Sequence, residues 1–251
     1  MDLGIDGKVA LVMGASRGIG RGIAAALARE GARVAISARS EDSLKEAAEQ
    51  IDIDARPFAA DTSDLERLAA LPGAVEKALG PIEILVTNTG GPPPGGVLDF
   101  EVDQWQEAYR SLVLAPQVLI SAVIPGMRER GWGRIVNVGS TSTREPIPGL
   151  VLSNVHRMAA IGLFKTLATE VARDGITVNT VATGMFATDR LADTRGSLDN
   201  AEQYAATAVP AGRLGLPEEY GDLVAFLASE RGAYLTGAVI PLDGGLLKSA
   251  F

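Results

Sequence analysis

Hydrophobic positions along the chain follow two alternating patterns. Short runs rich in Val, Ile and Ala predict buried strands, and longer stretches with apolar residues at helical spacing predict helices. Strands are expected at Lys8–Met13, Arg33–Ser37, Arg56–Ala60, Ile82–Thr87, Arg134–Val138, Thr177–Val181 and Ala238–Leu242. Helices are expected at Gly20–Arg29, Asp42–Ile51, Asp64–Leu79, Val102–Met127, Leu150–Arg173 and Pro217–Ala228. This order predicts an α/β fold, a doubly wound seven-stranded parallel sheet with helices on both faces.

Two irregular segments interrupt this alternation. The Gly- and Pro-rich run at 90–96 directly follows a strand, where an open α/β sheet places its ligands, so we interpret it as an active-site loop. Residues 183–215 lack a clean apolar period and are long for a connection, which predicts a substrate lid with helical pieces. Because no linker divides the chain, residues 1–251 are expected to form a single domain.

A glycine-rich turn lies between the first strand and the first helix. Its sequence is Gly14-Ala15-Ser16-Arg17-Gly18-Ile19-Gly20. In a Rossmann-like fold the three glycines would make the tight turn, admit a pyrophosphate to the backbone and pack the helix on the strand. The turn, with Ser16, Arg17 and Ile19 between its glycines, is therefore predicted to bind a dinucleotide; the alternative is an ordinary glycine-rich turn.

The end of the second strand bears on which dinucleotide binds. A carboxylate there would accept hydrogen bonds from ribose hydroxyls, but the strand ends in Ser37-Ala38-Arg39. Arg39 and Arg17 could surround a ribose phosphate with two guanidinium groups, which favours NADP(H) over NAD(H). Alternatively, both arginines are solvated surface charges.

Composition narrows the function classes. The chain contains 47% hydrophobic residues, enough for a globular core. With 23 basic and 31 acidic residues its net charge is −8, which argues against nucleic-acid or membrane-surface partners. It contains no Cys and one His, so we expect no metal site. The start Met1–Asp6 has no basic or apolar leader pattern, which predicts a cytoplasmic protein.

Further motifs identify a resemblance to the short-chain dehydrogenase/reductase family, running from Gly7 to Gly245. Besides the glycine turn, they are Asp61-Thr62, Asn88-Thr89-Gly90, Gly133–Ser140, Gly175–Asn179, Gly184-xxx-Thr188, Gly212–Glu219, Phe226–Ser229, Thr236-Gly237 and Asp243–Gly245. Within the family the chain resembles bacterial reductases named for 3-oxoacyl-carrier-protein substrates. The resemblance implies the Rossmann-like fold, a nicotinamide cofactor and a carbonyl or alcohol substrate.

The resemblance also implies further cofactor contacts. Asp61 and Thr62 would meet the adenine, and Asn88 and Gly90 would line a ribose. The motif Gly184-xxx-Thr188 would hold the nicotinamide carboxamide through Thr188. Each has a structural alternative, since Asp61 could cap a helix, Asn88 could tie neighbouring strands and Thr188 could start a helix.

The catalytic positions depart from the family pattern of Asn, Ser, Tyr and Lys. The segment Ala159–Glu170 matches the family sequence just after Tyr-xxx-Lys, which places Ser153 at the tyrosine and Arg157 at the lysine. Counting from Ser140 gives the same positions, and Leu112 stands where the asparagine is expected. An alkyl hydroxyl is a far weaker acid than a phenol, and an arginine stays protonated, so the family's usual proton relay cannot operate.

Electrostatic help to hydride transfer is what remains. Ser153 and Arg157 are four residues apart on one helix face and, with Ser140 opposite, could surround a substrate oxygen with donors. Arg157 could also bind the ribose hydroxyls. The proton could come from water, His156 or Tyr109, although His156 could equally be an ordinary packed residue.

Three functions are compatible with these residues. The first is an atypical NADP(H)-dependent oxidoreductase acting on a small carbonyl or alcohol, for which a 3-oxoacyl thioester is one substrate. The second is a nucleotide-binding homologue with little or no turnover, acting as a cofactor sensor or partner subunit. The third is a lyase, dehydratase or isomerase on the same scaffold, because fold alone does not fix the reaction.

The family resemblance also implies a homotetramer. The uncharged runs 111–127 and 146–155 on the two long helices fit buried subunit contacts. At the end of the chain Phe251 could be buried in another such contact or belong to a frayed tail.

Overall fold

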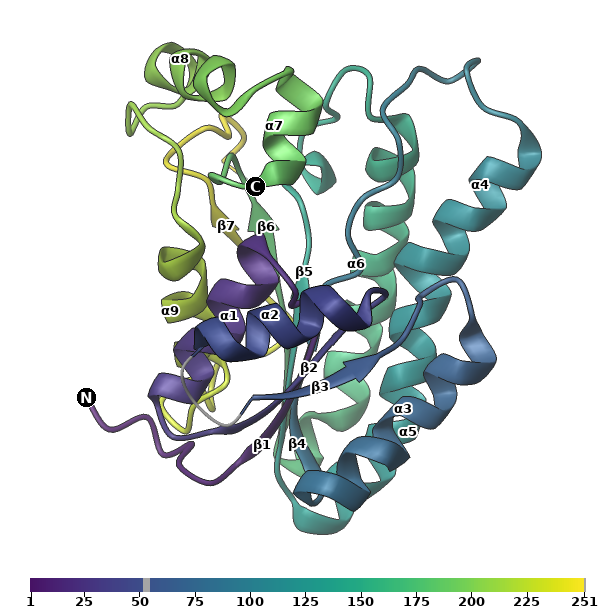
Figure 1. Cartoon of the computed structure of the whole chain (residues 1–251), viewed down its shortest axis with the longest axis vertical. Helices are drawn as coiled ribbons and strands as arrows, with labels where there is room; N and C mark the ends of the chain where they lie inside the picture. Colours follow the sequence, from purple (N-terminus) through teal and green to yellow (C-terminus); the bar gives the residue numbers. More distant parts are fainter. Residues whose placement is uncertain (52–54, 251) are drawn as a thin grey trace.

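Seven parallel strands form one sheet in the order β3-β2-β1-β4-β5-β6-β7 (Figure 1). This computed structural model describes residues 1–51 and 55–250, so Phe251 lies outside the described residues. The strands are β1 (Val9–Met13), β2 (Arg33–Ala38), β3 (Arg56–Ala59), β4 (Ile82–Thr87), β5 (Gly133–Val138), β6 (Ile176–Thr183) and β7 (Val239–Leu242). The predicted doubly wound fold is confirmed, with strand ends within two residues of their expected positions.

Helices cover both faces of the sheet. They are α1 (Gly18–Arg29), α2 (Glu41–Ile51), α3 (Leu65–Leu79), α4 (Val102–Tyr109), α5 (Ala115–Arg130), α6 (Val151–Val171), α7 (Asp189–Arg195), α8 (Leu198–Ala208) and α9 (Pro217–Leu227). Alternate strand residues point to opposite faces, so Val12 packs with α1, α2 and α9, whereas Leu11 packs with α3, α5 and α6. Figure 1 shows α1 and α9 on one side of the sheet and α5 and α6 on the other.

The helix predicted as one piece at Val102–Met127 is divided. A π-helical turn, η1 (Arg110–Leu114), separates α4 from α5. Pro116 accounts for the break, because it has no N–H to donate to the carbonyl of Leu112 and its ring would clash with that carbonyl. By length and composition the run Val102–Arg130 could cross a membrane, but Leu119, Val123 and Met127 of this run are packed in the core under the sheet.

Short pieces complete the chain at both ends of the strands. The 3-10 turn η2 (Thr141–Thr143) follows β5, and the 3-10 turn η3 (Ala172–Asp174) follows α6. Within the predicted lid 183–215, α7 and α8 bury Ala201, Ala205 and Val209 in a small core of their own with Met185 and Leu214. Figure 1 shows α7 and α8 beyond the carboxyl end of β6. The predicted helical pieces of this segment are therefore present.

Candidate active site

The glycine turn predicted to bind a dinucleotide joins β1 to α1. Gly14 has a φ of 59°, in the left-handed region that favours glycine, and an added Cβ there would lie 2.4 Å from the backbone oxygen of Asn88. A Cβ on Gly20 would lie 2.1 Å from the oxygen of Gly14. Asn88 Nδ2 donates to that same oxygen over 3.2 Å, so Asn88 ties the end of β4 to the turn. Only glycine fits both positions. The turn at 14–20 leads directly into the N-terminus of α1, and together they form the candidate pyrophosphate site.

The N-terminus of α7 lies against this turn. Thr188 is the N-cap of α7, where its hydroxyl accepts from Leu191 N–H, and its Cγ2 would lie 3.2 Å from a Cβ on Gly18. The next residue, Asp189, forms an exposed ion pair with Arg17 at 3.3 Å. Thr188 therefore starts a helix, which was the structural alternative for this residue. It also lies beside the glycine turn, so its position is compatible with a cofactor contact as well.

The remaining predicted cofactor residues border the same end of the sheet. Arg39 is exposed just after β2 and forms no ion pair with any residue in 1–51 or 55–250. Asp61 accepts from Ser63 N–H in the turn after β3, while the N-cap of α3 is Asp64. The others have the following positions: Ser16 and Ile19 are half-buried in the glycine turn, Thr62 Oγ1 lies 3.5 Å from Ser111 Oγ, Gly90 is exposed after β4, and Gly184 N–H donates to Leu242 O.

Arg157 is the central side chain at the ends of β4 and β5. It lies on the first turns of α6, and its Nε donates to Ser153 Oγ over 3.2 Å, as expected for residues four apart on one helix face. Its Nη1 donates to the carbonyls of Val138 and Gly139 at 2.9 and 3.3 Å, and its Nη2 donates to Gly90 O at 2.6 Å. The guanidinium therefore bridges the segments after β4 and β5, an arrangement that the sequence did not predict.

Burial lowers the pKa of Arg157 to about 10, and the nearby charge of Arg190 acts in the same direction. The group stays protonated at neutral pH. On the other face of the sheet, the Tyr220 hydroxyl lies 3.0 Å from Thr183 Oγ1 and 3.4 Å from Val181 O. Burial raises the pKa of Tyr220 well above its ordinary value, so this phenol stays neutral. Tyr220 therefore adds no negative charge beside the protonated Arg157.

Two serine hydroxyls at the carboxyl edge of the sheet have an O–H that is free to donate. Ser140 Oγ accepts from Ser142 N–H at 3.1 Å, and Ser153 Oγ accepts from Arg157 Nε. Neither hydroxyl has an acceptor within residues 1–51 and 55–250, so each can donate its own O–H to a ligand oxygen. Ser140 follows β5 and Ser153 lies on the first turn of α6, so both belong to the edge that Arg157 bridges.

His156 and its neighbours are packed side chains. His156 is 6% exposed, its Nδ1 is 2.7 Å from Leu152 O, and its ring lies 5.7 Å from Trp105 and 6.3 Å from Tyr109. This is the ordinary packed arrangement that the sequence left open. Tyr109 is 44% exposed on α4, and Leu112 is buried in η1, where it offers no hydrogen bond.

Arg190 is a site residue that the sequence analysis missed. Its Nη2 donates to Pro92 O in the loop after β4, which connects α7 to that loop. The signal in the sequence was limited to a basic residue two positions after Thr188. Because Arg190 and Pro92 are 98 positions apart, only the folded chain brings them together.

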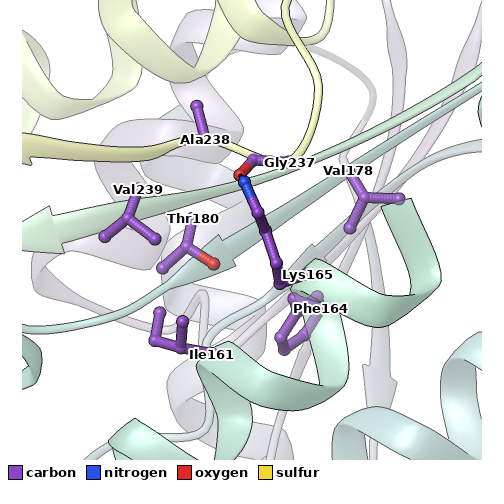
Figure 2. A pocket seen from close by; sticks show the side chains of 8 residues that line it. All are labelled: Ile161, Phe164, Lys165, Val178, Thr180, Gly237, Ala238 and Val239. Atoms are coloured by element: carbon purple, nitrogen blue, oxygen red, sulfur yellow. Dashed lines mark hydrogen bonds between the residues drawn. The ribbon is translucent and has the colours of Figure 1, made fainter. Parts of the chain in front are cut away.

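Two cavities lie away from these residues. Figure 2 shows one between α6 and β7, with Lys165 extending across it so that Nζ donates to Gly237 O at 2.6 Å. Its volume of about 10 Å³ has room for about one water molecule. A groove of about 290 Å³ adjoins it at Ile161 and Val239. None of the predicted cofactor residues lines either one.

Comparison with known proteins places the site in a family context. Residues 14–247 match the family model described as enoyl-(acyl carrier protein) reductase. The 3-oxoacyl-[acyl-carrier-protein] reductase of Vibrio cholerae serotype O1 is 36% identical over 244 residues, which cover 97% of this chain and 99% of that protein. The L-sorbose reductase of Gluconobacter frateurii, solved with NADPH and L-sorbose, is 34% identical, covers 99% of this chain and 100% of that chain, and has a TM-score of 0.93. An NADPH-dependent reductase of bacilysin biosynthesis is 30% identical, covers 96% and 99%, and has a TM-score of 0.91.

Proposed function

Because this chain belongs to the short-chain dehydrogenase/reductase family, and because the relatives named above are reductases, we propose that it is an NADP(H)-dependent oxidoreductase. Its reaction is hydride transfer between the nicotinamide and a small carbonyl or alcohol substrate. A 3-oxoacyl thioester is the first substrate to test, since the relatives include 3-oxoacyl-[acyl-carrier-protein] reductases. The observation that carries the proposal is the pair of hydroxyls, Ser140 and Ser153, each with a free O–H beside the protonated Arg157.

The described residues fit a dinucleotide, because a Cβ at Gly14 or Gly20 would clash with the backbone of Asn88 or Gly14, and glycine at both positions permits the tight turn at the N-terminus of α1. The turn 14–20 would hold the pyrophosphate, and Arg17 with Arg39 would hold the ribose phosphate of NADP(H). The residues for the adenine, ribose and carboxamide are Asp61, Thr62, Asn88, Gly90, Gly184 and Thr188. When bound, NADPH supplies the hydride that reduces a carbonyl carbon.

The chain's own residues act on the substrate oxygen. As negative charge develops on that oxygen, the O–H groups of Ser140 and Ser153 donate to it. Arg157 strengthens the Ser153 donor, because its Nε bonds to Ser153 Oγ and polarises the hydroxyl. Neither hydroxyl is acidic enough to be the proton source, so the proton comes from water. This assigns Ser153 and Arg157 to the positions that Tyr and Lys hold in the family pattern.

The test follows NADPH absorbance over time with a panel of carbonyl compounds that includes 3-oxoacyl thioesters. We expect substrate-dependent loss of NADPH, reduced by up to about hundredfold in Arg157→Ala, because this variant weakens the Ser153 donor and one oxyanion donor typically contributes about hundredfold. Arg173→Ala is the matched control, because Arg173 is exposed in η3, the turn that directly follows α6. Retention of full activity in Arg157→Ala would contradict the assigned role.

A second function has its own supporting observation. Four hydrogen bonds of Arg157 go to acceptors in its own chain, which suits a nucleotide-binding homologue with little or no turnover, a cofactor sensor or partner subunit. Tight NADPH binding without NADPH loss on any carbonyl would favour this function.

We further propose that the protein is a cytoplasmic homotetramer with no nucleic-acid or membrane partner, and that 183–215 forms the substrate lid. Support for the tetramer comes from α4 and α6, which pack together and expose Val102, Tyr109, Val155 and Met158 at 44–68%. Apolar groups exposed together on adjacent helices suit a subunit contact. Light scattering tests this proposal, and a monomer would contradict it.

A further inference from the structure

Two guanidinium groups lie on either side of the loop that follows β4. Arg157 from α6 donates to Gly90 O, and Arg190 from α7 donates to Pro92 O. The intervening Gly91 is so close to Arg190 that an added Cβ would lie 3.1 Å from Nη2. Both cations therefore border the same three-residue segment at the carboxyl edge of the sheet.

Among residues 1–51 and 55–250, no carboxylate compensates these two charges. Their hydrogen-bond partners are neutral carbonyl and hydroxyl oxygens, and neither arginine forms an ion pair within the part of the chain that the structure describes. By contrast, Arg17 pairs with Asp189, and Arg213 forms a two-pronged pair with Glu219. In a chain of net charge −8, two guanidiniums without an ion pair, the exposed Arg190 and the half-buried Arg157, lie beside the proposed reaction site and would attract an anion from outside the protein.

Arg190 also keeps most of its hydrogen-bonding capacity. A guanidinium has five N–H donors in a planar fork, and those of Arg157 are mostly occupied by Ser153, Val138, Gly139 and Gly90. Arg190 donates only to Pro92 O among the described residues, which leaves a free edge of its fork. That edge matches the two oxygens of a carboxylate.

We propose that the substrate is a small oxo acid, or the corresponding hydroxy acid, whose carboxylate binds to Arg190. The proposal rests on the proposed function, which it narrows. In the reducing direction, the carbonyl carbon gains a hydride from NADPH and the carbonyl oxygen gains a proton from water, giving the hydroxy acid and NADP⁺. The carboxylate stays unchanged, and its bond to Arg190 positions the carbonyl between Ser140 and Ser153.

The test compares oxo acids with their uncharged methyl esters. Pyruvate, acetoacetate and levulinate, each with its methyl ester, are titrated by calorimetry into protein mixed with saturating NADP⁺, so that binding is measured without turnover. We expect at least one acid to bind more tightly than its ester by about tenfold to a hundredfold, the range of a charge-assisted hydrogen bond. Arg190→Met should remove that preference and leave the ester's affinity unchanged.

Arg195→Met is the matched control, because it removes the same charge from the same helix while Arg195 lies 4.0 Å over the Tyr204 ring. It should keep the acid preference. Equal affinity of acids and esters, or no binding of any of them, would overturn the proposal. So would a loss of NADPH affinity in Arg190→Met with the acid preference intact, because Arg190 would then serve the cofactor phosphates.

The same mixtures, assayed with NADPH, report separately on the proposed function. An acid preference that depends on Arg190 but comes with no NADPH oxidation would reject the oxidoreductase and keep the carboxylate site. NADPH oxidation with no acid preference would keep the oxidoreductase and reject the carboxylate site.

Discussion

The glycine turn and the edge formed by β5 and α6 are built in opposite ways. At the turn, the shape comes from the backbone and from missing side chains, since a Cβ at Gly20 would lie 2.1 Å from Gly14 O. At the end of β5 and the start of α6, side chains define the site, and most donors of Arg157 already bind carbonyls of its own chain. The difference teaches that the predicted pyrophosphate site depends on backbone shape, whereas the proposed chemistry depends on side chains, and the two regions meet at Gly90, whose carbonyl accepts from Arg157.

The largest expected effect comes from adding a side chain at Gly20, where it would clash with the backbone of the turn. Gly20→Val forces the turn to shift, so NADPH affinity should fall by at least about hundredfold, or about 2.7 kcal/mol. Gly73→Ala is the control, because Gly73 lies in α3 with no atom within 4 Å of an added Cβ. Fluorescence titration measures the affinity, and circular dichroism checks the fold. NADPH binding at wild-type strength in Gly20→Val would refute the role of the turn.

The next largest effect concerns Ser153 and Arg157 at the start of α6. The double variant Ser153→Tyr with Arg157→Lys restores a phenol and an amine at the family positions, so carbonyl reduction should rise by about hundredfold, the usual contribution of a positioned general acid. NADPH affinity should change little, because the glycine turn is untouched. Ser153→Phe with Arg157→Lys controls for size without the hydroxyl. If kcat/KM does not rise, Leu112 or the segment 183–215 is the obstacle, and adding Leu112→Asn separates the two.

A smaller effect is expected for cofactor choice. Arg39→Ala should weaken NADPH binding by about tenfold through loss of a charge-assisted contact with the ribose phosphate. NADH, which lacks that phosphate, should bind as before. Arg33→Ala is the control, an exposed arginine at the start of the same strand. Equal losses for NADPH and NADH would mean that Arg39 acts on the fold and not on the phosphate.

The smallest effect concerns α9, which packs on α1 and so supports the glycine turn from behind. Hydrogen bonds from Arg213, and then from Leu216 N–H, lower the pKa of Glu219 to about 2. A carboxyl whose pKa is lowered in the folded state stabilises the fold at pH values above its ordinary pKa of 4.5. That stabilisation is lost as the pH falls toward 2. Because the pair is exposed, Glu219→Gln should cost only about 1 kcal/mol or less at pH 7.

Thermal unfolding of wild-type protein and Glu219→Gln at a series of pH values measures this effect. The difference in Tm should be greatest near neutral pH and should shrink steadily below about pH 4.5. A difference that stays constant with pH would mean that the charge of Glu219 is not its source. NADPH affinity at pH 7 should be the same in both proteins.

Local pattern was enough for the sheet, the glycine turn and the pairing of Ser153 with Arg157. Strand and helix periods depend on neighbouring residues, and a spacing of four on a helix fixes a shared face wherever the helix lies. The π-helical turn was missed, although Pro116 carried its signal, because the apolar period runs on through it.

The contacts that decide the chemistry came only from the tertiary structure. Arg157 reaches Gly90, Arg190 reaches Pro92 and Asp189 reaches Arg17 across separations of 67, 98 and 172 residues. No local pattern encodes such pairs, since they depend on how the sheet brings strand ends and the lid segment together. The sequence by itself thus determined which donors are present, and the folded chain decided which remain free, because a carbonyl can occupy a guanidinium only where the backbone passes within hydrogen-bond distance.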